Sequence, residues 1–145
     1  MTIDEQFEIG QQALKAQAFS QLVGAELTAF DAGHVTLEIP IRDDLLQQNG
    51  FVHGGVLSYA ADNALTFVGG SMLGHNVLTS EYKINYLKPG VGDRLVARGS
   101  VVYVGKRQAV CRCDVYAISE GKADTLCATA QGTIVAFEPA STQRS

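Results

Sequence analysis

The chain carries two hydrophobic patterns, one typical of strands and one typical of helices. Apolar side chains stand at every second position from Val35 to Ile41, which predicts a strand with one face in a core. Pro40 lies on the other face and puts the end of this strand at a sheet edge, because proline has no N–H for a ladder hydrogen bond. A shorter strand is expected just before it, over 25–30.

Four longer strand-like runs follow later in the chain, at 77–87, 93–104, 108–118 and 123–137. Each is about ten residues long and is bounded by glycine, proline or charged turn residues. The connections between them are short, as in an antiparallel meander, in which strands that follow one another in the chain also pair.

The first helix is expected over residues 4–18. Phe7, Leu14 and Ala18 follow spacings of seven and four, so they share one helical face. At the opposite terminus, residues 138–145 carry no such pattern and are expected to form a frayed tail.

A central helix is expected to begin near Gly54 or Gly55 and to end around Val68, where Gly69-Gly70 would stop it. Its residues are apolar nearly all round, which is typical of a buried helix. One long helix with five or six strands predicts an α+β domain in which a twisted antiparallel sheet wraps a single helix.

Composition narrows the class of protein. The 145 residues suit one domain spanning 1–145, and 46% hydrophobic with 18% charged residues is typical of a globular chain. A net charge of −4 argues against nucleic acid as a partner. The apolar stretches are too short to cross a bilayer, and the acidic start of the chain does not resemble a signal peptide, so we expect a cytoplasmic protein without a membrane partner.

The cysteines and histidines do not form a recognisable metal site. Cys111 and Cys113 would share one face of a strand, and no second ligand pair accompanies them. We interpret the three cysteines as small buried hydrophobes in a reducing compartment, with a metal or redox role as the alternative. The spacing of His34, His53 and His75 matches no metal-ligand pattern, and no metal or cofactor is expected.

The candidate catalytic groups lie where the polar, glycine-rich loop meets the predicted central helix. Glycines at a helix start let backbone N–H groups approach a ligand, and the first N–H groups of a helix have no intrahelical partner. Gly54 and Gly55 therefore suit an oxyanion-binding site, although a tight turn into the helix would need the same residues.

Asp62 is the other unusual residue, since it lies in an apolar stretch and no other acid occurs between Asp44 and Glu81. It follows Gly55 by seven residues, and Thr66 follows it by four, so carboxylate and hydroxyl share one helical stripe. Burying a carboxylate is costly, so it is either satisfied structurally or held for chemistry. A carboxylate with helix N–H groups suits hydrolysis of an activated ester, the carboxylate acting as general base or nucleophile.

The run QQNGFVHGGVLSYAADNALT, residues 47–66, resembles the acyl-CoA thioesterases of the hotdog fold, especially the phenylacetate-degradation and 4-hydroxybenzoyl-CoA thioesterase (Arthrobacter-type) branch. The similarity extends over residues 20–137 and includes the strand that ends in Leu87-Lys88-Pro89, the hairpin Gly105-Lys106-Arg107 and the last strand. It implies a sheet wrapped around one helix, a homodimer or homotetramer, and active sites shared between subunits. The implied reaction converts acyl-CoA to a free acid and CoA, so CoA is part of the substrate.

The resemblance also implies roles for single residues. Asp62 matches the catalytic carboxylate, Gly54 the N–H that polarises the thioester carbonyl, and Gln47 an amide near the reaction centre. Thr66 matches a helix hydroxyl that places water or the carboxylate, and Thr79 resembles a strand hydroxyl that positions water. The resemblance further implies that Gly54 of one chain faces Asp62 of its partner.

Other assignments keep two interpretations. His53 has a direct role or only shapes the turn, and Gln48 and Asn49 compete with Gln47 for the amide position. Lys106 and Arg107 bind the CoA phosphates or are solvated surface charges.

The acyl pocket is expected near the helix residues Gly55, Tyr59 and Asn63 and the strand residues Tyr82 and Tyr86. A non-catalytic acyl-CoA sensor on the same fold is the alternative function, although we expect it to lack a carboxylate at Asp62. A hotdog dehydratase would need a His–carboxylate motif that is absent from this sequence.

Overall fold

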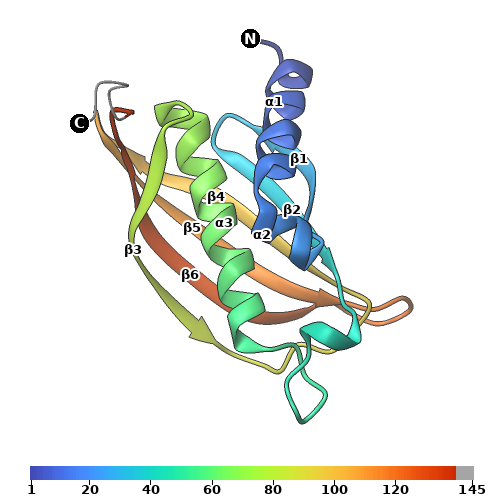
Figure 1. Ribbon diagram of the computed structural model, residues 1–145. Coiled ribbons are helices and arrows are strands. Elements are labelled where there is room, and N and C mark those ends of the chain that lie inside the picture. Colours follow the sequence, from blue (N-terminus) through green and yellow to red (C-terminus); the bar gives the residue numbers. More distant parts are fainter. Residues whose placement is uncertain (140–145) are drawn as a thin grey trace, which may run out of the picture.

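The computed structural model describes residues 1–139. The helices and strands are, in chain order, α1 (Ile3–Ala16), α2 (Ala18–Val23), β1 (Glu26–Asp31), β2 (His34–Pro40), a 3-10 turn (Asp43–Leu45), α3 (Gly54–Leu73), β3 (Val77–Tyr86), β4 (Arg94–Val104), β5 (Gln108–Ile118) and β6 (Thr125–Ala136). The strands form one six-stranded antiparallel sheet that curves around α3, and α1 and α2 lie on the same side of the sheet (Figure 1). This is the hotdog arrangement, so the predicted α+β fold class is confirmed.

The strand order is β1-β2-β4-β5-β6-β3, which corrects one part of the predicted topology. Strands β4, β5 and β6 form the expected meander, but β3 pairs with β6 at the far edge instead of with β4. The connection after β3 passes the end of the sheet, where the Leu87 N–H donates to the Cys127 carbonyl and the Val52 N–H donates to the Gly90 carbonyl. Alternation predicts that a run is a strand, but it does not say which strand is the partner.

The central helix is longer than predicted. It continues through Gly69 and Gly70 to Leu73, and Gly74, with φ of 104°, ends it. A Cβ atom at Gly69 would lie 2.4 Å from Cγ2 of Ile134, so the glycine lets α3 approach β6. The Gly69-Gly70 pair therefore reflects close packing, and the predicted stop at this pair is wrong.

The predicted helix over 4–18 corresponds to α1, which ends two residues earlier, at Ala16. A capping box between Thr2 and Glu5 begins α1, and Gln17, with extended backbone (φ −86°, ψ 104°), ends it. The second helix, α2, was not predicted, and Gly24 ends it with φ of 88°. At the other end of the chain, residues 138 and 139 lie outside the strands, and 140–145, the rest of the predicted tail, lie outside the described residues.

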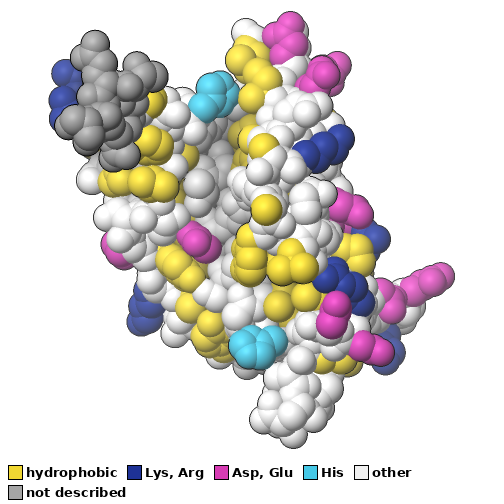
Figure 2. Space-filling view, viewed as in Figure 1, with side chains coloured by type: hydrophobic (Ala, Val, Ile, Leu, Met, Phe, Trp, Pro, Cys, Tyr) yellow, Lys and Arg dark blue, Asp and Glu magenta, His cyan; other side chains and the backbone are white. Residues whose placement is uncertain are grey.

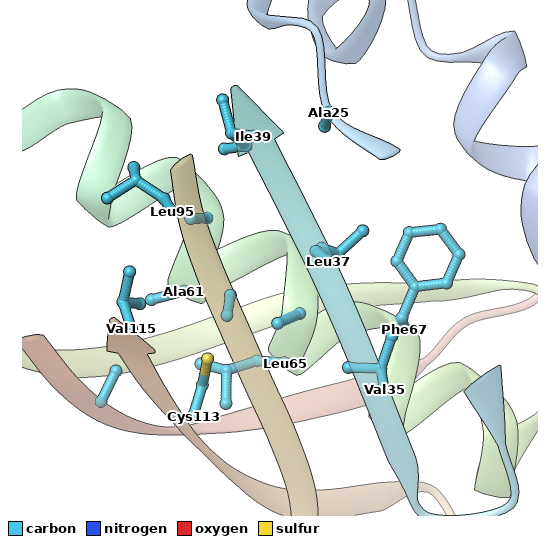
Figure 3. Close-up of a cluster of buried hydrophobic side chains, with 14 of the residues drawn as sticks. Ala25, Val35, Leu37, Ile39, Ala61, Leu65, Phe67, Leu95, Cys113 and Val115 are labelled. Carbon is cyan, nitrogen blue, oxygen red and sulfur yellow. The ribbon is translucent and has the colours of Figure 1, made fainter. Parts of the chain in front are cut away.

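The core lies between α3 and the concave face of the sheet (Figure 3). Leu65 of α3 is fully buried, and strands β2, β4 and β5 contribute Leu37, Leu95 and Val115. All three cysteines are free thiols in this core, as predicted. Residues 1–139 hold no group of three or more side chains able to bind a metal.

We expect Gly69→Ala to destabilise the protein by about 1–3 kcal/mol, because the added methyl group overpacks the contact with Ile134. Gly70→Ala is the matched control, since its Cβ would lie 3.5 Å from Val77, an ordinary contact. Alanine has the higher helix propensity, so Gly70→Ala should be neutral or stabilising by up to about 1 kcal/mol. Urea unfolding measures both, and equal stability of the two variants would contradict the packing argument.

The three thiols should be unreactive in the native protein. Burial raises the pKa of Cys111 to about 11 and that of Cys113 to about 12, and it also raises the pKa of Cys127. A thiol is neutral below its pKa, and only the thiolate is a good nucleophile. At pH 8 an aromatic disulfide reagent, which releases a coloured thiolate for each cysteine it modifies, should therefore react with three cysteines in urea. In buffer without urea it should react rapidly with none. A fast-reacting native thiol would contradict this expectation.

Candidate active site

The loop before α3 is a tight turn closed by Gln47. The Gln47 N–H donates to the Phe51 carbonyl at 2.8 Å, and the Gly50 N–H, at a residue with φ of 84°, donates to the Gln47 carbonyl at 3.0 Å. The side-chain oxygen of Gln47 accepts from the Asn49 N–H. Gln48 and Asn49 are exposed, whereas Gln47 is half-buried. Of the three amide residues, Gln47 is therefore the one whose backbone and side chain are hydrogen-bonded within the loop.

His53 caps the helix. Its Nδ1 accepts the Gly55 N–H at 2.8 Å, its carbonyl accepts the Val56 N–H at 2.9 Å, and its own N–H donates to the Leu45 carbonyl. The bond to Nδ1 occupies the Gly55 N–H, which was predicted to contact substrate. Among the described residues, the Gly54 N–H has no hydrogen-bond partner.

Gly54 borders an open hollow of about 360 Å³ that Gln47, Tyr86 and Lys88 also line. The Tyr86 hydroxyl lies 3.4 Å from the Gly54 carbonyl oxygen, and a Cβ at Gly54 would lie 3.7 Å from the Tyr86 ring. The helix start therefore presents one unpaired donor beside a solvent-accessible space, as an anion-binding helix terminus requires.

Asp62, Thr66 and Thr79 form a hydrogen-bonded cluster between α3 and β3. The Thr79 hydroxyl donates to Asp62 Oδ1 at 2.6 Å, and the Thr66 hydroxyl lies 3.0 Å from that of Thr79 and 2.9 Å from the Asp62 carbonyl. Within the part of the chain that the structure describes, Asp62 Oδ2 has no hydrogen-bond partner and Asp62 forms no ion pair. One carboxylate oxygen is held, and the other is available to a reacting molecule.

A second hydroxyl pair lies one helical turn before Asp62, where the Ser58 hydroxyl contacts that of Tyr82. The register of β3 against β6 shifts between Thr79 and Glu81, so a bulge brings Thr79 and Tyr82 to the same side of the strand despite their odd spacing. Strict alternation would place them on opposite faces, so the sequence alone does not indicate that Thr79 and Tyr82 both face α3. Bulges often redirect side chains beside active sites.

Tyr59 and Asn63 face a different neighbour from Asp62. The Tyr59 hydroxyl donates to the buried Ser20 hydroxyl, and the Asn63 amide donates to the Tyr59 oxygen at 3.0 Å and to Gln17 Oε1 at 3.2 Å. Burial raises the pKa of Tyr59. This network joins α2 to α3, so both predicted acyl-pocket side chains have structural partners within the chain.

Lys106 and Arg107 lie in the β4–β5 turn and are exposed. The Arg107 carbonyl accepts the Ala136 N–H, and Ala136 pairs with Val77, which follows the C-terminal end of α3. The two cations are therefore at the opposite end of α3 from Gly54 of their own chain.

Gly54 and Asp62 are also apart. Eight residues of helix separate them by about 12 Å along the axis at ~1.5 Å per residue, too far for one carbonyl group to contact both. One thioester group therefore cannot contact the unpaired N–H and the available carboxylate oxygen of the same chain.

Comparisons with known proteins agree with this architecture. A family model described as the thioesterase superfamily matches residues 49–123, which include α3 with Gly54 and Asp62. The crystal structure of a thioesterase family protein from Silicibacter pomeroyi is 30% identical, covers 94% of this chain and 98% of its own, and superposes with a TM-score of 0.85.

Two Escherichia coli relatives carry more specific names. The medium/long-chain acyl-CoA thioesterase YigI is 24% identical over 74% of this chain and 81% of its own, and the acyl-coenzyme A thioesterase PaaI is 29% identical over 64% and 66%. Within residues 1–139, no helix is long and apolar enough to cross a membrane. The matched family model and the shared fold lead to one conclusion: this chain belongs to the thioesterase superfamily.

Proposed function

We propose that the protein hydrolyses acyl-CoA thioesters to a free carboxylic acid and CoA. The observation that carries the proposal is the Asp62 carboxylate, which is anchored through Oδ1 by Thr79 and open at Oδ2. The names of the YigI and PaaI relatives support CoA thioesters as the substrate class. The more specific Arthrobacter-type assignment remains part of this proposal.

Asp62 Oδ2 is the reacting atom in both chemical routes that fit. As a general base it takes a proton from water while the water oxygen attacks the thioester carbon; as a nucleophile it attacks that carbon itself, and water then hydrolyses the anhydride. In both, the C–S bond breaks and the CoA sulfur leaves as a thiolate that takes up a proton. Thr79 holds the carboxylate in orientation, and Thr66 supports Thr79.

The Gly54 N–H donates to the thioester oxygen as negative charge develops on it. The side-chain NH2 of Gln47, for which the described chain offers no acceptor, is a second donor on the same side of the hollow. Since Gly54 and Asp62 of one chain are about 12 Å apart, the complete site takes Gly54 from one subunit and Asp62 from another.

Strand β3 supports such a dimer. It is ten residues long, it has no neighbour on its outer side within residues 1–139, and Leu78 and Tyr86 on it are 57% and 55% exposed. A long unpaired edge of this kind favours pairing with another chain. Antiparallel pairing of two β3 strands would continue the sheet and bring Lys106 and Arg107 of one chain toward Gly54 of its partner, where they would bind the CoA phosphates. Two such dimers would form a tetramer.

The first test is release of CoA from a panel of aryl, short-chain and long-chain thioesters. We expect the wild type to release CoA and Asp62→Asn to lose at least ~100-fold in kcat, as is typical when a general base is removed. Asparagine keeps an oxygen that can accept from Thr79, so the variant should fold normally, which circular dichroism checks.

The outcomes of this test distinguish an error in the proposed reaction from an error in the proposed catalytic residue. If the wild type released no CoA from any thioester but bound acyl-CoA, the chain would be a binding or sensing module. If Asp62→Asn kept full activity, the chain would be a thioesterase with a different catalytic group.

The second test removes the Gly54 N–H. Proline is compatible with the first position of a helix, and the preceding His53, with φ of −58° and ψ of 135°, has the backbone that a residue before proline prefers. We expect Gly54→Pro to lower kcat by ~10²–10³, typical of losing one oxyanion donor. Gly54→Ala is the control, because it adds a Cβ but keeps the N–H. Equal activity of these two variants would exclude the proposed donor.

Mixing Asp62→Asn chains with Gly54→Pro chains tests whether the site is shared. After refolding together, half of randomly assorted dimers are mixed and each mixed dimer has one intact site, so activity should return to about a quarter of the wild-type value. A site within one chain predicts no recovery.

A further inference from the structure

A groove runs between α1 and α3 on the side of α3 that faces away from the sheet. It has a volume of about 200 Å³, and its walls are the α1 residues Ile9, Gly10 and Ala13, Phe30 of β1, and the α3 residues Phe67 and Gly70. Figure 2 shows the surface hollowed between α1 and the start of β3. The groove exists because three of these residues are small, and a Cβ at Gly70 would meet only Val77, at 3.5 Å.

The direction of the groove follows from its polar contacts. Gln17, at the end of α1, is hydrogen-bonded to Asn63, so this end lies one residue from Asp62 in the sequence. Gln6, near the start of α1, and His75, after α3, line the groove as well and belong to its far end. Thr66 lines the wall next to Asp62 and bonds to the Asp62 carbonyl. The Thr66 hydroxyl also contacts that of Thr79, which holds the Asp62 carboxylate, so the groove begins two hydrogen bonds from the carboxylate and leads away along α3.

The chemistry of the walls favours an apolar occupant. Most of the wall is apolar, being lined by Ile9, Ala13, Phe30 and Phe67. At the end near Asp62, the Asn63 side-chain NH2, Gln17 Oε1 and the Thr66 hydroxyl already have hydrogen-bond partners within the chain. The distance from Asn63 to Gly70 is about 10.5 Å along the helix, so the space is elongated. Since a cavity of roughly 150 Å³ holds the six carbons of benzene, about 200 Å³ suits an alkyl chain of about eight carbons.

We propose that this groove binds the alkyl chain of the substrate's acyl group, with α1 as the wall that sets the preferred chain length. The inference rests on the proposed thioester hydrolysis and specifies its substrate as an unbranched, medium-length fatty acyl thioester. Ala13 and Gly70 are the residues that determine specificity, since any larger side chain there shortens the groove.

The experiment compares kcat/KM for straight-chain acyl-CoA thioesters from two to sixteen carbons. For the wild type, kcat/KM should rise about fourfold for each added methylene, the factor that corresponds to roughly 0.8 kcal/mol per buried group, and level off near eight carbons. Ala13→Phe should lower kcat/KM for octanoyl-CoA by at least about tenfold and leave acetyl-CoA unchanged. Gly70→Ala, which favours the helix, should give a smaller loss in the same direction.

Gln12→Phe is the matched control, because Gln12 is exposed on α1 and does not line the groove. Binding of the non-hydrolysable thioether S-octyl-CoA, measured by calorimetry, gives a readout independent of turnover, and Ala13→Phe should weaken it by a similar factor. If Ala13→Phe reduced all chain lengths equally, or left octanoyl-CoA hydrolysis and S-octyl-CoA binding unchanged, the groove would be excluded while thioester hydrolysis stood. If the wild type hydrolysed no thioester yet Ala13→Phe weakened S-octyl-CoA binding, the groove would stand and the proposed reaction would fail.

Discussion

The structure depends on covering a helix that is apolar on almost every side. Eight residues of α3 are buried, its first turn carries no acidic residue, and no salt bridge within residues 1–139 involves it. Its stability therefore comes from packing against neighbouring elements rather than from local interactions. The sheet covers one side, α1 and α2 cover part of another, and the stripe toward β3 carries Ser58, Asp62 and Thr66. The candidate site lies on this stripe.

The contacts of this stripe with β3 explain how an otherwise apolar helix accommodates the Asp62 carboxylate. Asp62 is half-buried, and Thr79 satisfies one of its oxygens across a short hydrogen bond from a strand that is distant in the chain. A carboxylate satisfied on one side only is held in one orientation without losing its capacity to accept a proton. The bulge in β3 is what allows Thr79 and Tyr82 to face α3 together, so a local irregularity of the sheet edge organises the site.

Strand β3, at the edge of the sheet, contributes to the candidate site and also carries the unpaired backbone of the proposed dimer interface. Strand β3 supplies Thr79 to the carboxylate on its inner side and leaves its outer backbone unpaired. The unpaired Gly54 N–H lies two helical turns before Asp62 on α3. The proposed pairing of two β3 strands would give both features a partner, while α1 and α3 of each chain line the groove.

Local patterns in the sequence were sufficient for much of this protein. Alternation over 35–41 and the turn residues that bound the other runs predicted every strand to within a few residues. The apolar run predicted a buried central helix, and the spacing of Asp62 and Thr66 placed them on one stripe, because both depend on the helical period. The partner of β3, the length of α3 through Gly69, the break at Gln17, and the placement of Tyr59 and Asn63 against α2 were decided by tertiary structure. Each depends on contacts between residues far apart in the chain, such as Gly69 with Ile134 and Asn63 with Gln17, and no periodicity within one element encodes them.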